Sequence, residues 1–491
     1  MIQRTDIDTI QSYLTDASNL QGSADVVYIP EDIKELKQII IKCHSENTPM
    51  NPAGAGTGLT GSRVPLSGVV ISTEKLTKII SIDKTKQRIT VEPGIFRSEI
   101  ESELGALGYF VPPSPTEKNS AIGGNVATNA SGARTFKYGA IREFITGLKV
   151  FLFNGEEIIL RRGENFANNY ELKLLTESGR KISLHLPSIN MPEIKHAAGY
   201  FLKPNMDAID LFIGSEGTLG IISEIELSFI PLPENVLGGI IFFDDENRHI
   251  QFVEEVRRLS KENNLKDYRT VSDVSARVLE FFDVNSVNLL RDKYRQIPPD
   301  AKGAIWFEQE FSSENESAVL ESWATIISEY SALGDFTWIA QNEKEHENLR
   351  QFRHELPLQV YEVYSANSQL KLGTDIAVPD VHFQESYQFV KQEIQKLQIP
   401  YVIFGHIGNC HLHTNIFIKD EEERKRAYEF YDAYIEHSLK LGGTVSAEHG
   451  IGKLKKKYLN KMFGQEAING MKAIKQILDE KYLLNVGTLF D

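Results

Sequence analysis

The sequence is poor in cysteine, with only Cys43 and Cys410 among 491 residues. Two isolated thiols provide no disulfide framework and no CxxC redox pair, and they are too few to bind an iron–sulfur cluster. Any iron–sulfur cluster would therefore have to lie on a partner protein.

Positive charge and long apolar runs are also scarce. Lys and Arg number 53 against 68 Asp and Glu, which gives a net charge of −15 and argues against nucleic acid as a partner. Charged residues interrupt the first twenty positions, and no run approaches the ~20 apolar residues of a transmembrane segment. We therefore expect a cytoplasmic protein without a membrane span. Peripheral membrane contact through the lysines at 453 and 455–457 stays open, although a solvated helix face is the favoured interpretation.

The hydrophobic content of 41% is sufficient for a large core in two to three domains. Apolar residues at helical spacing predict an amphipathic helix over 31–44. Alternating or β-rich segments predict strands at 69–73, 88–94, 148–160 with a turn at Asn154-Gly155, and 221–229.

Pro231 and Pro233 end the last of these strands, so we place a domain boundary near 231. Beyond it, strands and helices alternate, including an expected helix over 246–263 and a strand over 304–311. This order indicates an α+β domain with helices on a sheet. The polar segment 163–200 has weak periodicity and is expected to be a loop or an insertion.

A glycine-rich stretch at 51–65 offers successive backbone amides that could cradle a pyrophosphate. Gly56, Gly58 and Gly61 match the GxGxxG spacing of dinucleotide-binding Rossmann folds, but we expect neither a buried strand before them nor a helix after them. A nicotinamide site is therefore rejected. Similar small-residue blocks at 120–144 and 214–222 indicate that one extended ligand contacts all three segments.

Three of the twelve histidines lie within eight positions, at 406, 411 and 413. If 411–417 is a strand, His411, His413 and Asn415 share one face, and His406 can fold back over Gly408 to join them. Such a cluster suits zinc, manganese or a similar divalent ion. Further along, Glu448 could complete a metal site, and the adjacent His449 could transfer protons.

At these residues the sequence resembles the FAD-linked oxidase family of the vanillyl-alcohol-oxidase or PCMH type, which includes D-lactate, glycolate and D-2-hydroxyglutarate dehydrogenases. PAGAGTGLTG resembles its pyrophosphate loop, IGGNVATNASG followed by Tyr-Gly its flavin-cradling segment, and GSEGTLGI its third FAD contact. The resemblance implies an α+β fold in which FAD lies between two α+β subdomains and a cap with an antiparallel sheet covers the flavin. The implied domains are a PCMH-type FAD-binding domain at 1–230, a substrate-binding cap at 231–440 and a C-terminal segment at 441–491 that returns to the FAD domain.

The resemblance also implies the cofactor and its contacts. No histidine lies between His44 and His185, so FAD is expected to be noncovalent. The family's Asn-Pro-Gly contact appears as Asn485-Val486-Gly487, without the proline. The expected FAD-binding residues are Pro52, Gly54, Ala55, Gly56, Thr57, Gly58, Leu59, Ser62, Pro115, Thr116, Ile122, Gly123, Gly124, Ala127, Asn129, Gly132, Tyr138, Gly139, Glu216, Gly217, Ile222 and Asn485.

By the same resemblance, His406, His413 and Glu448 are the expected metal ligands, whereas His411 stands where close relatives carry asparagine. It could act as a neighbour of the ligands or compete as one. Arg353 is expected to bind the substrate carboxylate by bidentate pairing. Lys371 is a weaker candidate and is left out of the catalytic set.

The resulting hypothesis is that FAD accepts a hydride from C2 of a small D-2-hydroxy acid, with a metal lowering the pKa of the hydroxyl and His449 accepting its proton. A metal-dependent hydrolase and a non-catalytic flavoprotein subunit of a larger oxidase are the alternatives. The particular acid stays open, as do the electron acceptor (quinone, cytochrome, electron-transfer flavoprotein or iron–sulfur subunit) and a homodimeric state.

Overall fold

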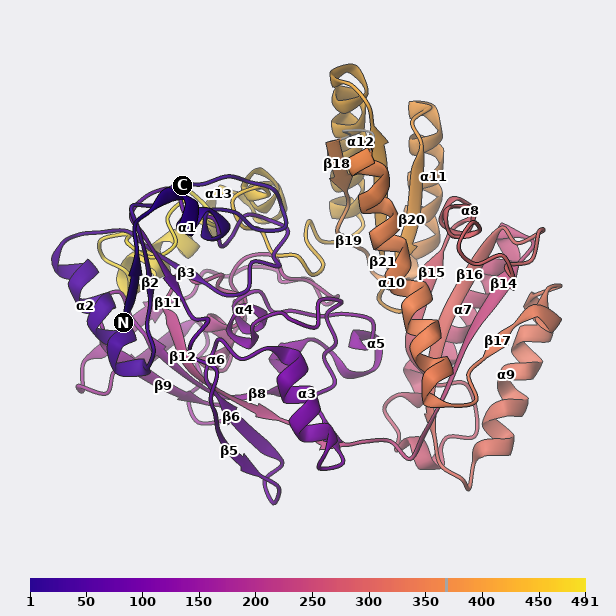
Figure 1. Cartoon of the computed structure of the whole chain (residues 1–491), viewed down its shortest axis with the longest axis horizontal. Coiled ribbons are helices and arrows are strands. Elements are labelled where there is room, and N and C mark those ends of the chain that lie inside the picture. The colour runs from indigo at the N-terminus through magenta and orange to yellow at the C-terminus, as the bar shows by residue number, and fades with distance from the viewer. Residues whose placement is uncertain (367–369) are drawn as a thin grey trace. The chain divides into compact units, whose positions relative to one another are not determined.

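The computed structural model describes residues 1–366 and 370–491, in which the backbone forms two compact units (Figure 1). The first unit comprises Met1–Ser131, Ala140–Leu232 and Val445–Asp491, and the second comprises Gly132–Gly139 and Pro233–Thr444. The short segment Gly132–Gly139 thus packs with the second unit, although the sequence analysis grouped it with 1–230. Among the described residues, no helix has both the length and the apolar composition that crossing a bilayer requires.

The first unit contains a four-stranded sheet in the order β1-β2-β4-β3, with β3 at one edge. Strand β2 pairs antiparallel with β1 and parallel with β4, and β3 also runs parallel to β4. The strands are β1 (Ile2–Arg4), β2 (Val26–Ile29), β3 (Met50–Ala53) and β4 (Val69–Ser72). Helix α2 (Ile33–Ser45) connects β2 to β3 and begins at Asp32, whose side chain accepts a hydrogen bond from the Glu35 backbone N–H.

A second, antiparallel sheet of the first unit has the order β5-β6-β12-β8-β9. Along β12, every second side chain is buried, as its apolar–polar alternation predicts. The strands of this sheet are β5 (Ile79–Asp83), β6 (Arg88–Val91), β8 (Ile145–Phe151), β9 (Glu157–Arg161) and β12 (Ile221–Ser228), and a small pair joins β7 (Tyr109–Phe110) to β13 (Ile230–Pro231). The other helices of this unit are α1 (Ile7–Ile10), α3 (Arg97–Gly105), α4 (Ile122–Ala127), α6 (Ile209–Phe212) and α13 (Lys456–Leu478).

Two expectations for the first unit are wrong. The segment 163–200 is not only loop, because β10 (Glu171–Leu175) and β11 (Lys181–His185) form an antiparallel hairpin that buries alternate residues. The glycine loop at 51–65 does follow a strand, β3, in which Pro52 is tolerated at the sheet edge. No helix follows this loop before β4, so the argument against a Rossmann site depends on the missing helix alone.

The second unit is built on one antiparallel sheet, described as eight strands, in the order β17-β14-β16-β15-β20-β21-β18, with β19 paired to β21. Its strands are β14 (Asn235–Phe243), β15 (Ala276–Phe282), β16 (Gly303–Phe311), β17 (Trp338–Ile339), β18 (Leu370–Gly373), β19 (Ile376–Ala377), β20 (Tyr401–Gly405) and β21 (His411–Ile418). Lys371 belongs to β18, and its side chain lies outside the described residues.

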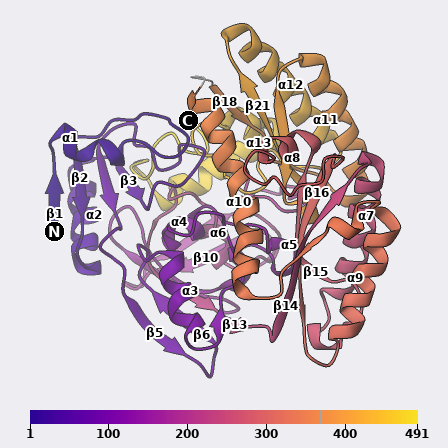
Figure 2. The ribbon, with the colours of Figure 1, turned by 45° about the vertical axis from the view of Figure 1, so that its right-hand side comes forward.

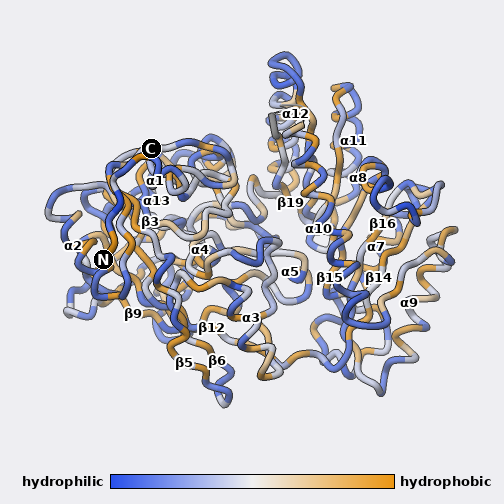
Figure 3. Tube along the Cα trace, viewed as in Figure 1, coloured by the Kyte–Doolittle hydropathy of each residue, from blue (hydrophilic) through white to orange (hydrophobic). Residues whose placement is uncertain are grey.

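Helices cover this sheet in two groups (Figure 2). Helix α7 (Glu246–Asn263) packs beside α9 (Glu316–Tyr330), and α11 (Phe383–Leu397) packs beside α12 (Glu421–Lys440). Residues Glu421–Arg426 at the start of α12 are all charged, and hydrophilic stretches are visible at α12 in Figure 3. The remaining helices are α5 (Thr135–Tyr138), α8 (Val284–Leu290) and α10 (Glu343–Ala366).

One hydrophobic core cluster of the second unit lies between the sheet and α10. Phe352 and Leu356 of α10 pack with Phe282 of β15 and Phe404 of β20, and all four are almost fully buried. This packing fixes one face of α10 against the strands that carry the polar residues described next.

Candidate cofactor cleft and histidine cluster

A cleft in the first unit encloses ≈ 930 Å³ of space, part of which is open to solvent. Three chain segments form its walls: the loop after β3, the first turns of α4, and the residues between α6 and β12. These are the three glycine-rich segments singled out from the sequence. The structure therefore brings them together around one space.

Glu216 connects this cleft to the C-terminal segment of the same unit. Its side chain is buried and accepts hydrogen bonds from the backbone N–H groups of Ile451 and Gly452, both at 2.8 Å. Burial raises the pKa of Glu216, while these hydrogen bonds oppose the shift. The Asn485 side-chain amide donates to the Glu216 carbonyl at 2.6 Å. Residues far apart in sequence thus hold one wall of the cleft.

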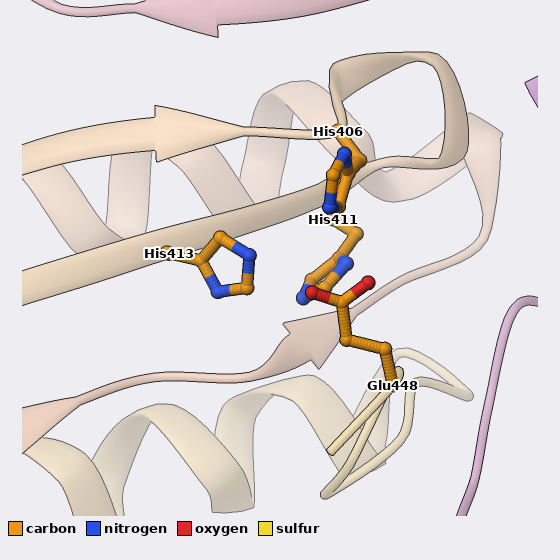
Figure 4. Close-up of side chains that lie close together, drawn as sticks. All are labelled: His406, His411, His413 and Glu448. Atoms are coloured by element: carbon orange, nitrogen blue, oxygen red, sulfur yellow. The ribbon is translucent and has the colours of Figure 1, made fainter. Parts of the chain in front are cut away.

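The second unit carries the histidine cluster at the end of neighbouring strands. His406 follows β20, and His411 and His413 are the first and third residues of β21, on one face of the strand (Figure 4). The ring centroids are 5.5 Å apart for His406 and His411, 5.7 Å for His406 and His413, and 4.5 Å for His411 and His413. One potential ligand atom from each ring lies within 4.8 Å of the others. The clustering predicted from the sequence is therefore present.

Gly405 allows this approach of the rings. It has φ of +139°, which L side chains rarely adopt, and a Cβ atom there would lie 3.0 Å from Cδ2 of His413. A larger residue at 405 would displace the His413 ring.

Two of the rings are oriented by acceptors in the same unit. Nδ1 of His406 bonds the Glu280 carboxylate, and Nδ1 of His413 lies 3.1 Å from the Thr374 carbonyl oxygen. Although burial favours the neutral acid, attraction to His406 and Arg353 lowers the pKa of Glu280 to about 2, so this carboxylate is ionised at neutral pH. Nε2 of the third ring, His411, lies 3.1 Å from the buried Asp375 carboxylate.

Arg353 lies on α10 in the core of the second unit and is 4% exposed. Its Nε donates to Glu280 at 2.6 Å, and its guanidinium lies over the Phe404 ring, 5.1 Å from the centroid. Nη1 is buried and has no hydrogen-bond partner among the described residues. A buried guanidinium N–H without an acceptor is costly, so this atom is suited to an anionic ligand.

Glu448 and His449 belong to the first unit, where they lie beside the glycine-rich segments. Glu448 accepts hydrogen bonds from Lys195 at 2.7 Å and from Ser131 at 3.3 Å. The backbone carbonyl of His449 accepts a hydrogen bond from the Thr60 hydroxyl at 3.1 Å, and its Nε2 lies 3.5 Å from Glu448. Thr60 belongs to the loop that follows β3, so His449 is attached to the edge of the cofactor cleft.

Two family models match the chain. The FAD binding domain matches residues 24–161, and the C-terminal domain of FAD linked oxidases matches residues 263–489. The chain belongs to the FAD-linked oxidase family. It is therefore an FAD-dependent oxidoreductase, and FAD is confirmed as a cofactor, whereas its noncovalent attachment and the metal ion stay predictions.

Relatives along the full length support the same membership. The glycolate oxidase subunit GlcD of Bacillus subtilis is 29% identical over 96% of this chain and 90% of its own length. A D-lactate dehydrogenase of Anaerostipes hadrus is 27% identical over 98% and 92%, and a D-2-hydroxyglutarate dehydrogenase of Stutzerimonas stutzeri is 24% identical over 99% and 95%.

A solved structure of alkyldihydroxyacetonephosphate synthase superposes with a TM-score of 0.66, covering 98% of this chain and 81% of the other at 16% identity. This likeness concerns the fold alone. Together with the domain match, it confirms the mixed α and β architecture and the PCMH-type FAD-binding fold.

Of the residues expected to contact FAD, thirteen line the cleft. They are Pro52, Gly54, Ala55, Gly56, Thr57, Gly58, Ser62, Gly123, Gly124, Ala127, Glu216, Gly217 and Ile222. Sequence reasoning missed ten further lining residues, among them Arg63, Pro93 and Ser215. Arg63 and Ser215 lie within the glycine-rich segments 51–65 and 214–222, which was the available signal for them, whereas Pro93 lies outside all three segments.

The other expected FAD contacts stay predictions. Leu59, Thr116, Asn129 and Asn485 are not among the cleft-lining residues, and Pro115 and Ile122 line a separate small cavity. Gly132, Tyr138 and Gly139 belong to the second unit, where the Tyr138 hydroxyl bonds Glu310.

Gly217→Ala is expected to weaken FAD binding by about 5- to 150-fold, because strain in the cleft wall, from the positive φ and the contact with Pro52, costs ~1–3 kcal/mol and 1.4 kcal/mol corresponds to tenfold. Gly217 has φ of +71° in the cleft, and a Cβ there would lie 2.8 Å from Cγ of Pro52. Gly108→Ala is the matched control, since Gly108 has φ of +82° with nothing within 4 Å of an added Cβ. FAD titration of the deflavinated proteins measures both, and equal affinities for the two variants would contradict the role of this wall.

Proposed function

We propose that this protein oxidises a small D-2-hydroxy acid to the 2-oxo acid, with noncovalent FAD as the hydride acceptor and a divalent metal ion held by His406, His413 and Glu448. The proposal is carried by the buried Arg353, whose Nη1 has no hydrogen-bond partner among the described residues. Glu280 bonds both Arg353 and His406, so this arginine is connected to the histidine cluster. The named activities of the relatives, on glycolate, D-lactate and D-2-hydroxyglutarate, support this substrate class.

Arg353 is proposed to bind the substrate carboxylate. A buried guanidinium whose Nη1 amino group is unused offers strong charge-assisted hydrogen bonds to an acid. Because Glu280 and Phe404 fix the plane of the group, little side-chain entropy is lost when the acid binds.

The histidine cluster fits a divalent ion by its chemistry. Glu280 and the Thr374 carbonyl accept hydrogen bonds from Nδ1 of His406 and His413, so Nε2 of each ring keeps its lone pair for a metal. Two imidazoles and a carboxylate suit zinc or manganese. A divalent ion in such a site supplies positive charge that favours loss of the substrate hydroxyl proton.

His449 is proposed to accept that proton as general base. Imidazole is the side chain most often used as a general base in enzymes. Membership in an FAD-dependent oxidoreductase family argues against the hydrolase alternative. Arg353 argues against a non-catalytic subunit, because a protein that binds no acid gains nothing from a buried guanidinium with an unpaired Nη1.

Anaerobic mixing with hydroxy acids tests the proposal. We expect glycolate or the D form of lactate or 2-hydroxyglutarate to bleach the flavin absorbance, whereas 1,2-propanediol, which lacks the carboxylate that Arg353 would bind, should leave it unchanged. No bleaching by any acid, or equal bleaching by the diol, would contradict the proposal. The same assay with quinones or redox proteins as oxidants identifies the class of electron acceptor.

A further inference from the structure

We propose that Glu280 is a positioning residue that orients the metal ligand His406 and the acid-binding Arg353 at the same time, so that metal binding and substrate binding both depend on one buried carboxylate. This inference rests on the proposed function and names a residue that the sequence analysis did not single out. All three side chains belong to the second unit.

The contacts of Glu280 divide between its two oxygens. Oε1 bonds Nδ1 of His406, and Oε2 accepts a hydrogen bond from Nε of Arg353 at 2.6 Å. The Glu280 side chain is fully buried, and His406 and Arg353 are each 4% exposed. Because solvent is excluded, water cannot replace either hydrogen bond if the carboxylate is removed.

The sheet places Glu280 beside His406. Strand β15, which carries Glu280, pairs with β20 so that Phe281 lies opposite Gly405, the residue before His406. The geometry of the pair is thus set by backbone hydrogen bonds rather than by flexible loops. Such rigid support is what a metal site needs to keep its ligands within a few tenths of an ångström.

The carboxylate also selects the form of the histidine. Because Nδ1 of His406 is bonded to Glu280, Nε2 is the ring nitrogen that remains for a metal. The same arrangement holds His413 through the Thr374 carbonyl. Without Glu280, the His406 ring would be free to change tautomer or to rotate, and a metal would lose a preoriented ligand.

Arg353 depends on the same carboxylate in a different way. The bond from Nε to Glu280 orients the guanidinium and leaves Nη1 unpaired for the acid. Glutamine at 280 would preserve the shape of the side chain, but its NH2 group cannot accept a hydrogen bond. If its oxygen keeps the bond to Arg353, its NH2 group can only donate to Nδ1 of His406, which places the ring hydrogen on Nε2 and takes the lone pair away from a metal.

The test compares Glu280→Gln with Glu308→Gln, a matched control. Glu308 is also buried, on the adjacent strand β16, and pairs with Arg277 at 2.7 Å. Zn²⁺ and Mn²⁺ affinities of metal-stripped protein are measured by competition with a chromogenic chelator, without any turnover. We expect Glu280→Gln to weaken metal binding about 10- to 100-fold and to raise KM for the acid, whereas Glu308→Gln binds metal as the wild type does.

Glu280→Asp covers the case in which Glu280→Gln does not fold. It keeps the charge but is too short to reach both partners, and we expect it to weaken metal binding in the same direction. Wild-type metal affinity in a folded Glu280 variant, or an equal loss in Glu308→Gln, would overturn the inference while leaving the proposed function intact. No metal binding by the wild type would instead overturn the metal-assisted function, and this inference with it.

Discussion

Replacement of His449 by alanine is expected to leave FAD bound but to slow flavin reduction by the hydroxy acid by about 10²–10⁴-fold, the usual contribution of a general base. FAD binding should survive because the contact of His449 with the glycine loop is made by its backbone carbonyl, which accepts a hydrogen bond from Thr60. The imidazole itself makes no contribution to that bond. Stopped-flow reduction at saturating acid, with the flavin content measured on the same sample, separates the two effects.

His185→Ala is the control for removing an imidazole from the first unit. His185 lies on β11, is exposed, and pairs with Glu171 at the surface. In the His185→Ala variant, the hydroxy acid should reduce the flavin at the wild-type rate. Near-wild-type reduction in His449→Ala would remove His449 from the role of base, and loss of FAD from that variant would indicate a structural role instead.

Elements with long periodic patterns were predictable from the sequence. The helix expected over 246–263 coincides with α7, because its apolar residues recur at helical spacing and Asp245 caps its first turn through the Arg248 N–H. The hairpin of β10 and β11 was missed because each strand has only five residues, too few for alternation to stand out from loop sequence. Strand β3 was missed because Pro52 argues against a strand unless the strand lies at a sheet edge.

In the candidate site, the features that depend on neighbouring residues in the sequence were predictable, and those that depend on distant residues were not. The three histidines fall within eight residues, so the alternation of a strand was enough to predict their clustering. Glu280 lies 126 residues before His406, and only the pairing of β15 with β20 brings the two together. Strand register of this kind is set by tertiary packing and has no signature in the sequence near either residue.

Replacing His413, a proposed metal ligand, by alanine is expected to abolish stoichiometric metal binding and to lower the rate of flavin reduction by about 10²–10⁴-fold, since a bound ion contributes several kcal/mol to stabilising developing charge. Treating the wild type with a chelator should have the same effect, and added Zn²⁺ or Mn²⁺ should restore the wild type but not His413→Ala. Metal analysis and stopped-flow reduction on the same samples measure both quantities.

The His411→Asn variant tests whether His411 binds the metal or only lies beside the proposed ligand His413. The ring centroids of His411 and His413 are 4.5 Å apart, Nε2 of His411 lies 3.1 Å from the Asp375 carboxylate, and the family resemblance places asparagine at this position. We therefore expect His411→Asn to keep its metal and most of its activity, although it removes an imidazole from the same strand. If His411→Asn lost the ion while His413→Ala retained it, the ligand assignment of the two histidines would have to be exchanged. If both variants and the chelated wild type reduced flavin normally, the oxidation would proceed without any metal at the cluster.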